Sequence, residues 1–417
     1  MKQRVIYSTV LFLILLSLVL IQACTARAVN DPDVPPFSAA DEALYSERFK
    51  ILVEALQTTG NVPPYDNLEP VAGTTDYQPL PRNLDSTAIS RTALDDAMNY
   101  AEVNNSSAFI VWHKGEIIAE KYFGDITADS LLTSYSLAKP LSVAAVGTAI
   151  SKGFIADLNI PVTNHLPEWK GSDKSTIQLD HILTMSSGLL PQALAPTEND
   201  VLNRAYLHPR HTEVILHEYP LVDVPGSRYE YSNANGEILA LILERATQER
   251  YGDWVGNTIL KPIGAQGGEV FVNRPGGTAH SGCCILLSAE SYLRLAILVL
   301  QDGVWNNERI LPEGFVQRIS SPSPTNKYTG MGMYLGQPYV ERRGYANHDT
   351  TPDKFKVFHS EPYLADDLVL FDGNRNQVVY IIPSKELVIL RTALGRARTE
   401  PEWDNSYLPN TILRGMN

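Results

Sequence analysis

The segment LLTSYSLAKPL, residues 131–141, decides how the rest of this chain is interpreted. It places Ser136 three residues before Lys139, with Pro140 directly behind the lysine. Residues three apart face the same side of a helix, so the amine of Lys139 can lie beside the hydroxyl of Ser136. Because proline is tolerated only in the first turn of a helix, the segment predicts a helix that begins at about Ser136.

Two readings of Ser136 follow from this spacing. A serine hydroxyl becomes a nucleophile only beside a base, and Lys139 must lose its proton to act as that base. A position at a helix start would also direct the backbone N–H of Ser136 toward developing negative charge. By itself, however, the spacing favours a plainer reading, in which the serine caps the helix and the lysine is solvated.

The triplet Tyr231-Ser232-Asn233 adds a second polar element. It lies in a loop after a Pro-Gly turn and directly before an amphipathic helical pattern. A phenol oxygen near a lysine can be partly deprotonated, so Tyr231 could take and return the proton of Ser136. The amide of Asn233 could orient the lysine or a substrate. Other Tyr-x-Asn triplets occur in the chain, and a buried, hydrogen-bonded tyrosine is the alternative reading.

Composition narrows the classes of partner. The chain has 417 residues and a formal net charge of −13. This length suits one large domain or two smaller ones. Because nucleic acids and anionic membranes repel an acidic protein, we expect no nucleic-acid partner. The 27 prolines and 27 glycines indicate many loops. The oligomeric state stays open.

The N-terminus has the layout of an export signal. MKQR is followed by an apolar run from Val5 to Ile21 and by small residues up to Cys24. We expect residues 1–24 to be a signal peptide with a lipid-bearing Cys24, and residues 25–105 to hold a linker and N-terminal helices. An uncleaved anchor and a plain cleaved signal are the alternatives. All three possibilities place the protein outside the cytoplasm, in the periplasm or cell envelope. A lipid on Cys24 or an uncleaved anchor would also tether it to the membrane.

The order of strand and helix patterns predicts an α+β fold. Two β-rich hairpin patterns, at 107–124 and 376–394, lie near opposite ends of the chain. We expect both hairpins to share one antiparallel sheet flanked by helices, with a mostly helical region inserted between them and a site in the cleft. The expected helical segments are 41–57, 86–104, 141–154, 179–189, 235–255 and 288–303.

Taken together, these motifs resemble the class C β-lactamase-related serine hydrolases, the family of penicillin-recognising enzymes and esterases. The likeness covers roughly Ala108 to Leu394 and is strongest to the 6-aminohexanoate-dimer hydrolase branch. It implies a β-lactamase/transpeptidase-like fold for residues 106–417. It also implies an acylated nucleophile at Ser136, with Lys139 and Tyr231 as general base and acid and Asn233 as a polar partner. The implied substrate is a small ester or amide, and no metal or organic cofactor is needed.

The family's third motif, Lys-Thr/Ser-Gly on a strand, finds its counterpart at Phe371-Asp372-Gly373. The resemblance implies that the N–H of Asn374 joins that of Ser136 in an oxyanion hole. An apolar ring replaces the lysine that helps penicillin-recognising members to hold the substrate carboxylate. A β-lactamase or D-alanyl-D-alanine carboxypeptidase is therefore the less favoured enzyme, and a non-catalytic binding or sensor module is the alternative from another class.

Other conspicuous residues are expected to be structural. The nine histidines show no metal-binding spacing, so we expect no metal site, and His280 is read as a packed histidine rather than a cleft residue. Cys283 and Cys284 are neighbours, and neighbouring cysteines rarely pair. We therefore expect them to be packed thiols and the domain to contain no disulfide.

Overall fold

The computed structural model describes residues 37–58, 67–191, 195, 197–344, 351–353, 356–395 and 401–417. The chain divides into the units Met1–Ala43 and Leu44–Asn417. The predicted signal and Cys24 lie outside the described residues. Among the helices within these ranges, none is long and apolar enough to span a bilayer.

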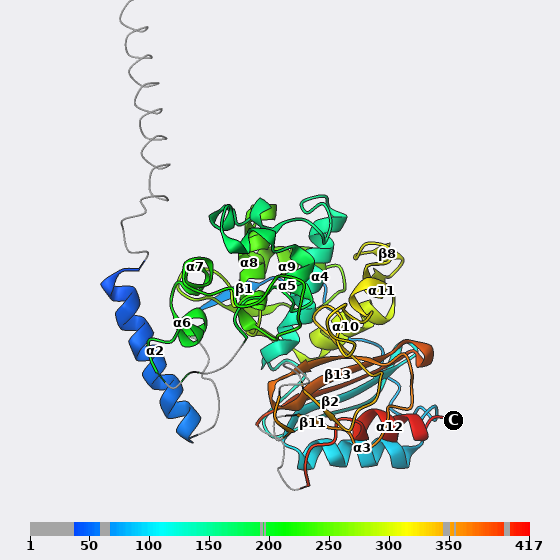
Figure 1. Ribbon diagram of the computed structural model, residues 1–417. Coiled ribbons are helices and arrows are strands. Elements are labelled where there is room, and N and C mark those ends of the chain that lie inside the picture. Colours follow the sequence, from blue (N-terminus) through cyan, green and yellow to red (C-terminus); the bar gives the residue numbers. More distant parts are fainter. Residues whose placement is uncertain are drawn as a thin grey trace, which may run out of the picture. The chain divides into compact units, whose positions relative to one another are not determined.

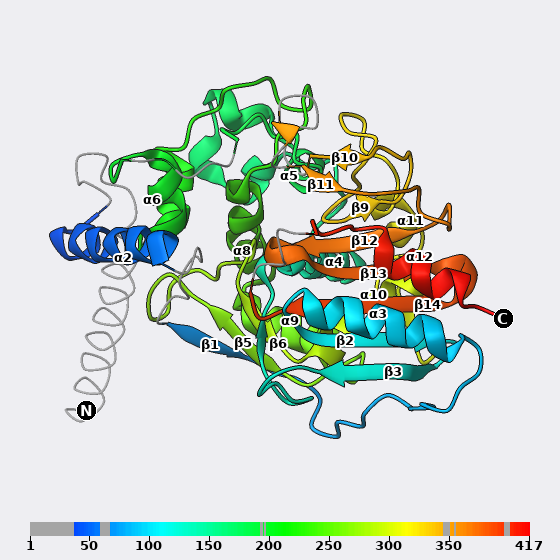
Figure 2. The ribbon, with the colours of Figure 1, turned by 90° about the horizontal axis from the view of Figure 1, so that it is seen from below.

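A six-stranded antiparallel sheet confirms the predicted union of the two ends of the chain. Its strand order is β3-β2-β14-β13-β12-β9 (Figure 2). The first hairpin turns at Lys114 and Gly115, which both have positive φ, and β14 pairs with β2 to join the two hairpins. The strands are β2 (Ser106–His113), β3 (Glu116–Tyr122), β9 (Tyr334–Leu335), β12 (Val369–Gly373), β13 (Gln377–Ile382) and β14 (Leu387–Ala393).

Helices cover both faces of this sheet. On one face, α3 (Arg91–Val103) and α12 (Tyr407–Arg414) lie side by side, and α10 (Ala289–Leu300) lies on the other (Figure 1). Apolar residues recur on the inner face of α3, and they share one buried core with the β14 residues Leu387 and Ile389. This burial of one helical stripe against aliphatic strand residues is what holds the layers together.

The inserted region is mostly helical and surrounds one central helix, α4 (Ala138–Ser151). Its residues from Ala138 to Ala149 are buried, and α8 (Asn233–Thr247) packs beside it. Other helices of the chain are α2 (Ala39–Thr58), α5 (Leu179–Leu183), α6 (Val201–Leu207), α7 (His211–His217), α9 (Tyr251–Val255) and α11 (Phe315–Ile319). The α5 helix is shorter than the predicted segment 179–189, because Met185 and Gly188 adopt positive φ.

A second, small sheet links the segment that contains Ser136 to the loop that contains Gly282. Its order is β1-β5-β6-β4, formed by Leu68–Val71, Gly268–Phe271, Ile285–Leu287 and Leu132–Thr133. Because β4 directly precedes the turn with Ser136 and β6 directly follows Cys284, their antiparallel pairing brings these two segments together. The remaining short strands are β7 (Val304–Trp305), β8 (Glu308–Arg309), β10 (Arg342–Arg343) and β11 (Val357–Phe358).

The start of α4 agrees with the prediction from Pro140, with one difference. A 3₁₀ turn, Tyr135–Leu137, precedes the α-helix, which itself begins at Ala138. Pro140 therefore lies in the first α-helical turn, where its missing N–H costs no hydrogen bond. Tyr135 has a φ of 46°, a conformation that non-glycine residues adopt only where the surrounding structure imposes it. The chain bends at Tyr135, and Ser136 follows directly.

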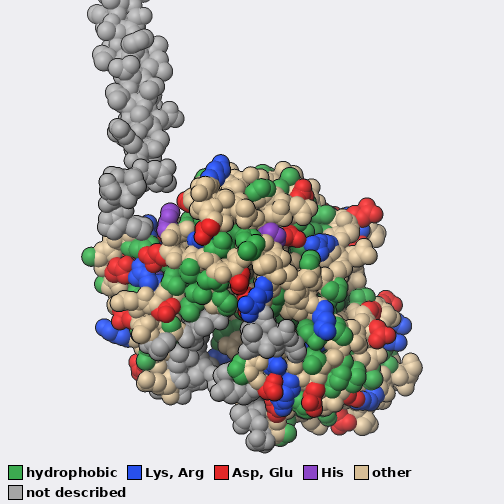
Figure 3. Space-filling view, in the orientation of Figure 1, with side chains coloured by type: hydrophobic (Ala, Val, Ile, Leu, Met, Phe, Trp, Pro, Cys, Tyr) green, Lys and Arg blue, Asp and Glu red, His purple; other side chains and the backbone are tan. Residues whose placement is uncertain are grey.

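The surface of the described part is mixed in charge. On the face shown in Figure 3, acidic side chains are interspersed with Lys and Arg side chains. Such interspersed charges are typical of a solvated surface.

Replacing Leu387 by alanine tests the shared core of sheet and helices. Leu387 is fully buried in the core that the sheet shares with α3 and α12, so Leu387→Ala should lower the free energy of unfolding by about 3 kcal/mol through lost burial and a residual cavity. Leu364, which is exposed, is the matched control, and Leu364→Ala should change stability by less than about 0.5 kcal/mol. Urea unfolding followed by circular dichroism measures both; equal effects would contradict the assignment of this core.

Candidate active site

Three segments bring the predicted polar residues together. Ser136 lies in the 3₁₀ turn before α4, Lys139 in the first turn of α4, and Tyr231 in the loop before α8. The Ser136 Oγ lies 2.8 Å from the Tyr231 hydroxyl, and the Lys139 Nζ donates to the same Oγ at 3.2 Å. The serine hydroxyl is therefore within hydrogen-bonding distance of both of the expected general acid–base groups.

Lys139 is a buried amine with three acceptors. Lys139 is 6% exposed. Besides its contact with Ser136, the Lys139 Nζ donates to Asn233 Oδ1 at 2.9 Å and to the Gly282 carbonyl at 2.7 Å. Its Nζ also lies 4.8 Å from the centre of the Tyr231 ring. An amine with three acceptors is suited to the ammonium form, which carries three hydrogens. The predicted contact between Asn233 and the lysine is present.

Gly282 is a contact that reasoning from the sequence missed. A Cβ atom at Gly236, on α8, would come within 2.7 Å of the Gly282 Cα, and one at Gly282 would come within 2.8 Å of a Glu237 oxygen. Only glycine at both positions permits this close approach of backbone to helix. The approach brings the Gly282 carbonyl to Lys139, and no motif in the sequence marks a carbonyl as a ligand.

The end of β12 lies against the turn Tyr135–Leu137. A Cβ atom at Gly373 would lie 3.1 Å from the Ser134 carbonyl oxygen and 3.2 Å from the Leu137 nitrogen. This contact supports the placement of the third motif at Phe371-Asp372-Gly373. Phe371 is 1% exposed and contributes no charge. Asn374 begins the turn that follows Gly373, and its role as an oxyanion donor stays a prediction.

Comparison with known proteins decides the family. The sequence profile of the Beta-lactamase family matches residues 99–401, which is most of the chain. This chain belongs to the Beta-lactamase family. The family resemblance and the β-lactamase/transpeptidase-like fold predicted from the motifs are thereby confirmed.

Individual relatives of this Beta-lactamase family chain agree with that assignment. A 6-aminohexanoate-dimer hydrolase of Paenarthrobacter ureafaciens is 25% identical over 270 residues, which cover 59% of this chain and 65% of the relative. A Bacillus anthracis structure, a candidate 6-aminohexanoate-dimer hydrolase, aligns with a TM-score of 0.64 and 20% identity over 84% of this chain and 90% of that one. EstCE1, a hydrolase with promiscuous acyltransferase activity, aligns with a TM-score of 0.55 and 13% identity, over 78% of this chain and 97% of its own. At these identities the structural matches show the fold.

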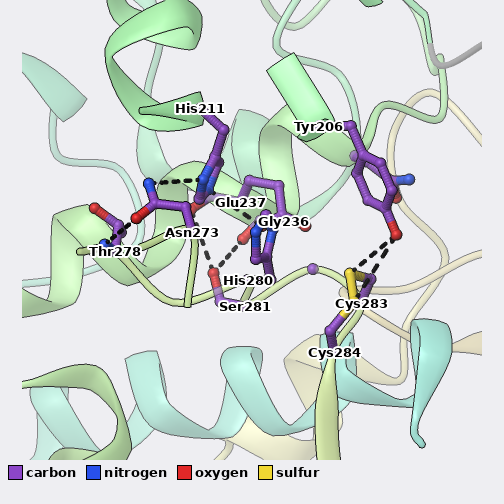
Figure 4. Close-up of polar contacts among 12 residues, drawn as sticks. Tyr206, His211, Gly236, Glu237, Asn273, Thr278, His280, Ser281, Cys283 and Cys284 are labelled. Carbon is purple, nitrogen blue, oxygen red and sulfur yellow. Dashed lines mark hydrogen bonds and ion pairs between the residues drawn. A yellow bond between two sulfur atoms is a disulfide. The ribbon is translucent and has the colours of Figure 1, made fainter. Parts of the chain in front are cut away.

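A buried carboxylate lies behind the Gly282 loop of this family member. Glu237 Oε2 lies 3.1 Å from His280 Nδ1 and 3.4 Å from His211 Nε2, and the two imidazole rings stack at 4.3 Å (Figure 4). Asn273 contacts the other nitrogen of His211 at 3.1 Å. His211 comes from α7, Glu237 from α8 and His280 from the loop after β5. Because these residues are far apart in the chain, their spacing in the sequence did not reveal this cluster.

Charge and burial set the protonation of this Glu237 group. Burial by itself would raise the pKa of the Glu237 carboxyl, but His280 and His211 outweigh it and hold that pKa at about 2. Burial, followed by the neighbouring His211, lowers the pKa of His280 to about 4. Among the described residues these three could hold a metal ion. His280 hydrogen-bonds to the Glu237 carboxylate through Nδ1 and is buried, as the structural reading expected.

The expectation for the two cysteines is wrong. Cys283 and Cys284 form a disulfide between neighbouring residues, whose Cα atoms are 3.7 Å apart. Cys283 lies in a tight turn and Cys284 directly follows it. The Cys283 carbonyl accepts from Ser134 Oγ at 2.9 Å. The Tyr206 hydroxyl contacts the Cys283 sulfur (Figure 4). Local turn geometry thus brings the sulfurs together. Since the bond closes no long loop, it restricts the unfolded chain little.

Acidification should destabilise the protein through His280. Its folded pKa of about 4 lies below the ordinary 6.5, so the unfolded chain binds this proton first, and stability is lost as the pH falls from 6.5 toward 4. Between pH 7 and pH 5 we expect a loss of about 2 kcal/mol from this group, because one pKa unit corresponds to about 1.4 kcal/mol. Urea unfolding at both pH values measures it.

The matched variants are His280→Gln and His217→Gln, because His217 is an exposed histidine. The first should lose part of the pH dependence, and the second should keep all of it. Burial lowers the pKa of His359 to about 4 as well, so some dependence should remain in His280→Gln. An unchanged dependence in His280→Gln would refute the assignment to His280.

Proposed function

We propose that this chain is a serine hydrolase that cleaves an ester or amide bond through an acyl-enzyme on Ser136. The observation that carries the proposal is the position of the Ser136 Oγ, which lies within hydrogen-bonding distance of both the Tyr231 hydroxyl and the Lys139 amine. A nucleophile in contact with a base, which is in turn oriented by a third group, is the arrangement that covalent catalysis requires. Membership of the Beta-lactamase family supports the same reaction class.

The contacts favour Tyr231 as the base of the acylation step. Lys139 has three acceptors, which stabilise its ammonium form, and that cation lies against the face of the Tyr231 ring. A nearby cation stabilises the phenolate of Tyr231, which can then accept the proton of Ser136. In this proposal Lys139 provides charge, and Tyr231 moves the proton.

The reaction then proceeds in two stages, acylation of Ser136 and hydrolysis of the acyl-enzyme. The Ser136 oxygen attacks the carbonyl carbon while its proton moves to Tyr231, and the N–H groups of Ser136 and Asn374 stabilise the oxyanion. Collapse of the intermediate breaks the bond to the alcohol or amine, which leaves with the proton from Tyr231. A water molecule gives its proton to Tyr231, attacks the acyl-enzyme and releases the acid, and Ser136 recovers its proton.

The substrate class is proposed from the third motif and from the relatives. Phe371 is buried and offers no cation to a substrate carboxylate, which speaks against a β-lactamase or D-alanyl-D-alanine carboxypeptidase. The relative named as a 6-aminohexanoate-dimer hydrolase, 25% identical, supports a linear amide or ester. A non-catalytic sensor is disfavoured because Ser136, Lys139 and Tyr231 keep reactive contacts. A penicillin-binding assay beside esterase and amidase assays separates these alternatives.

We also propose that the enzyme works outside the cytoplasm, tethered to the membrane through a lipid on Cys24. The support is the order of charges, apolar residues and small residues in segment 1–24. Metabolic labelling with a fatty-acid analogue, compared between the natural chain and Cys24→Ala, tests the lipid; labelling that is independent of Cys24 counts against it.

A fluorophosphonate probe should label Ser136. Such probes phosphonylate a serine that is deprotonated by a neighbouring base, so labelling reports the nucleophile without knowledge of the substrate. We expect stoichiometric labelling of the folded protein and none of Ser136→Ala, as measured by intact-mass spectrometry. Ser384→Ala, at an exposed hairpin turn, is the control and should label normally. Equal labelling of Ser136→Ala would overturn the proposed function.

Removing either the hydroxyl of Tyr231 or the amine of Lys139 should reduce turnover while the fold is kept. Tyr231→Phe removes only a hydroxyl, and Lys139→Met removes the charge at similar length. Each should lower kcat on a short-chain aryl ester by about 10² to 10⁴-fold, the usual contribution of general acid–base catalysis. Tyr339→Phe, which alters a partly exposed tyrosine, is the control and should keep its rate. Near-normal rates in both site variants would contradict the assigned roles.

A further inference from the structure

Gln377 connects the two segments that supply the predicted oxyanion hole. It is the first residue of β13 and pairs with Gly373 across the β12–β13 hairpin. Its side-chain nitrogen donates to the carbonyls of Thr133 at 3.0 Å and Ser134 at 3.1 Å. These two residues lead directly into the nucleophile turn. Gln377 is 1% exposed, so water does not compete with these hydrogen bonds.

We propose that Gln377 is a positioning residue that holds the N–H groups of Ser136 and Asn374 at the separation required by an oxyanion. This inference rests on the proposed function. The Ser136 N–H belongs to the nucleophile turn, and the Asn374 N–H belongs to the turn after β12. Gln377 lies at the start of β13, directly after the turn with Asn374. From there its side-chain amide hydrogen-bonds to the residues that precede Ser136. Its oxygen also accepts from the Ala393 N–H at 3.4 Å, which orients the amide.

The β12–β13 turn needs such support because its backbone is intrinsically disfavoured. Arg375 and Asn376 have φ values of 69° and 58°, in the left-handed region that favours glycine. Tyr135, on the opposite side of the predicted hole, has a φ of 46°. Non-glycine residues keep such conformations only where their surroundings impose them. Without external hydrogen bonds, both segments would relax and the two donors would separate.

Arg391 holds the same turn from behind. It is a buried residue of β14, and its Nη1 donates to the carbonyls of Arg375 at 2.7 Å and Asn376 at 2.9 Å. Its Nε donates to Ser106 Oγ at 2.7 Å, which ties the guanidinium to β2. Arg391 therefore stabilises the shape of the turn against the sheet. Of Gln377 and Arg391, only Gln377 hydrogen-bonds to the segment before Ser136. The distance between the Ser136 N–H and the Asn374 N–H therefore depends on Gln377.

The experiment compares Gln377→Met, Gln377→Glu and the surface control Gln301→Met. Methionine keeps the length of the side chain and removes both donors, whereas Gln301 is exposed at the end of α10. Turnover of an aryl ester is expressed per active site, counted by complete fluorophosphonate labelling. In Gln377→Met we expect kcat and kcat/KM to fall together by about 10- to 100-fold, with KM changed less than about twofold, because the lost contacts act on the transition state. Gln301→Met should behave as the natural chain.

Two further measurements separate positioning from a merely structural role. A trifluoromethyl ketone, which forms a tetrahedral oxyanion with the serine, should bind Gln377→Met more weakly by the same factor as the loss in kcat/KM. In Gln377→Glu, the neutral acid can donate one hydrogen bond and the carboxylate none. Its rate relative to the natural chain should therefore rise as the pH falls, and this variant carries the test if Gln377→Met does not fold.

Each outcome decides the inference. A normal kcat per labelled site in Gln377→Met, a change confined to KM, or a pH-independent rate ratio in Gln377→Glu would overturn it. Retained labelling of Ser136→Ala would instead overturn the proposed function, and the role of Gln377 would fall with it. Loss of labelling in Ser136→Ala together with normal Gln377 variants would leave the function standing and refute only the positioning role.

Discussion

The hydrogen bonding of the buried Lys139 amine is the constraint on which the site depends. A polar group removed from water is stable only if its hydrogen bonds are made, and here the acceptors come from three separate segments. These are the turn with Ser136, the first residue of α8 and the Gly282 loop. The need to satisfy one buried amine therefore holds these three segments together. The Lys139 amine also lies against the face of the Tyr231 ring.

The sheet provides the other half of the site. Because β14 pairs with β2, strands from both ends of the chain form one rigid layer, and β12 lies toward its far edge. The end of β12 lies against the turn that contains Ser136, where a Cβ at Gly373 would crowd the backbone. Hydrogen bonds from Arg391 hold the β12–β13 turn, which its own residues disfavour, and hydrogen bonds from Gln377 connect the strand after that turn to the segment before Ser136. The helical region and the sheet thus each contribute donors to one predicted oxyanion site.

Local patterns were predictable because the physics that produces them is local. The hairpin at Lys114 and Gly115 follows from Gly115, which tolerates positive φ, and the start of α4 follows from the missing N–H of Pro140. Ser136 and Lys139 lie on one side of the helix start because they are three residues apart. Tyr231 was found only through its place before a helix and through the family resemblance, since a Tyr-x-Asn triplet by itself has little specificity.

The sequence by itself determined the two hairpins and the helix start just before Pro140, and it predicted the roles of Ser136, Lys139 and Tyr231. Only the tertiary structure decided that a Gly282 carbonyl completes the lysine site, that Gln377 joins two distant backbones, and that Glu237 lies against two histidines. It also corrected the expectation for Cys283 and Cys284. The reason is physical: these contacts use backbone atoms, burial and close approach between segments far apart in the chain, and residue spacing carries no record of them.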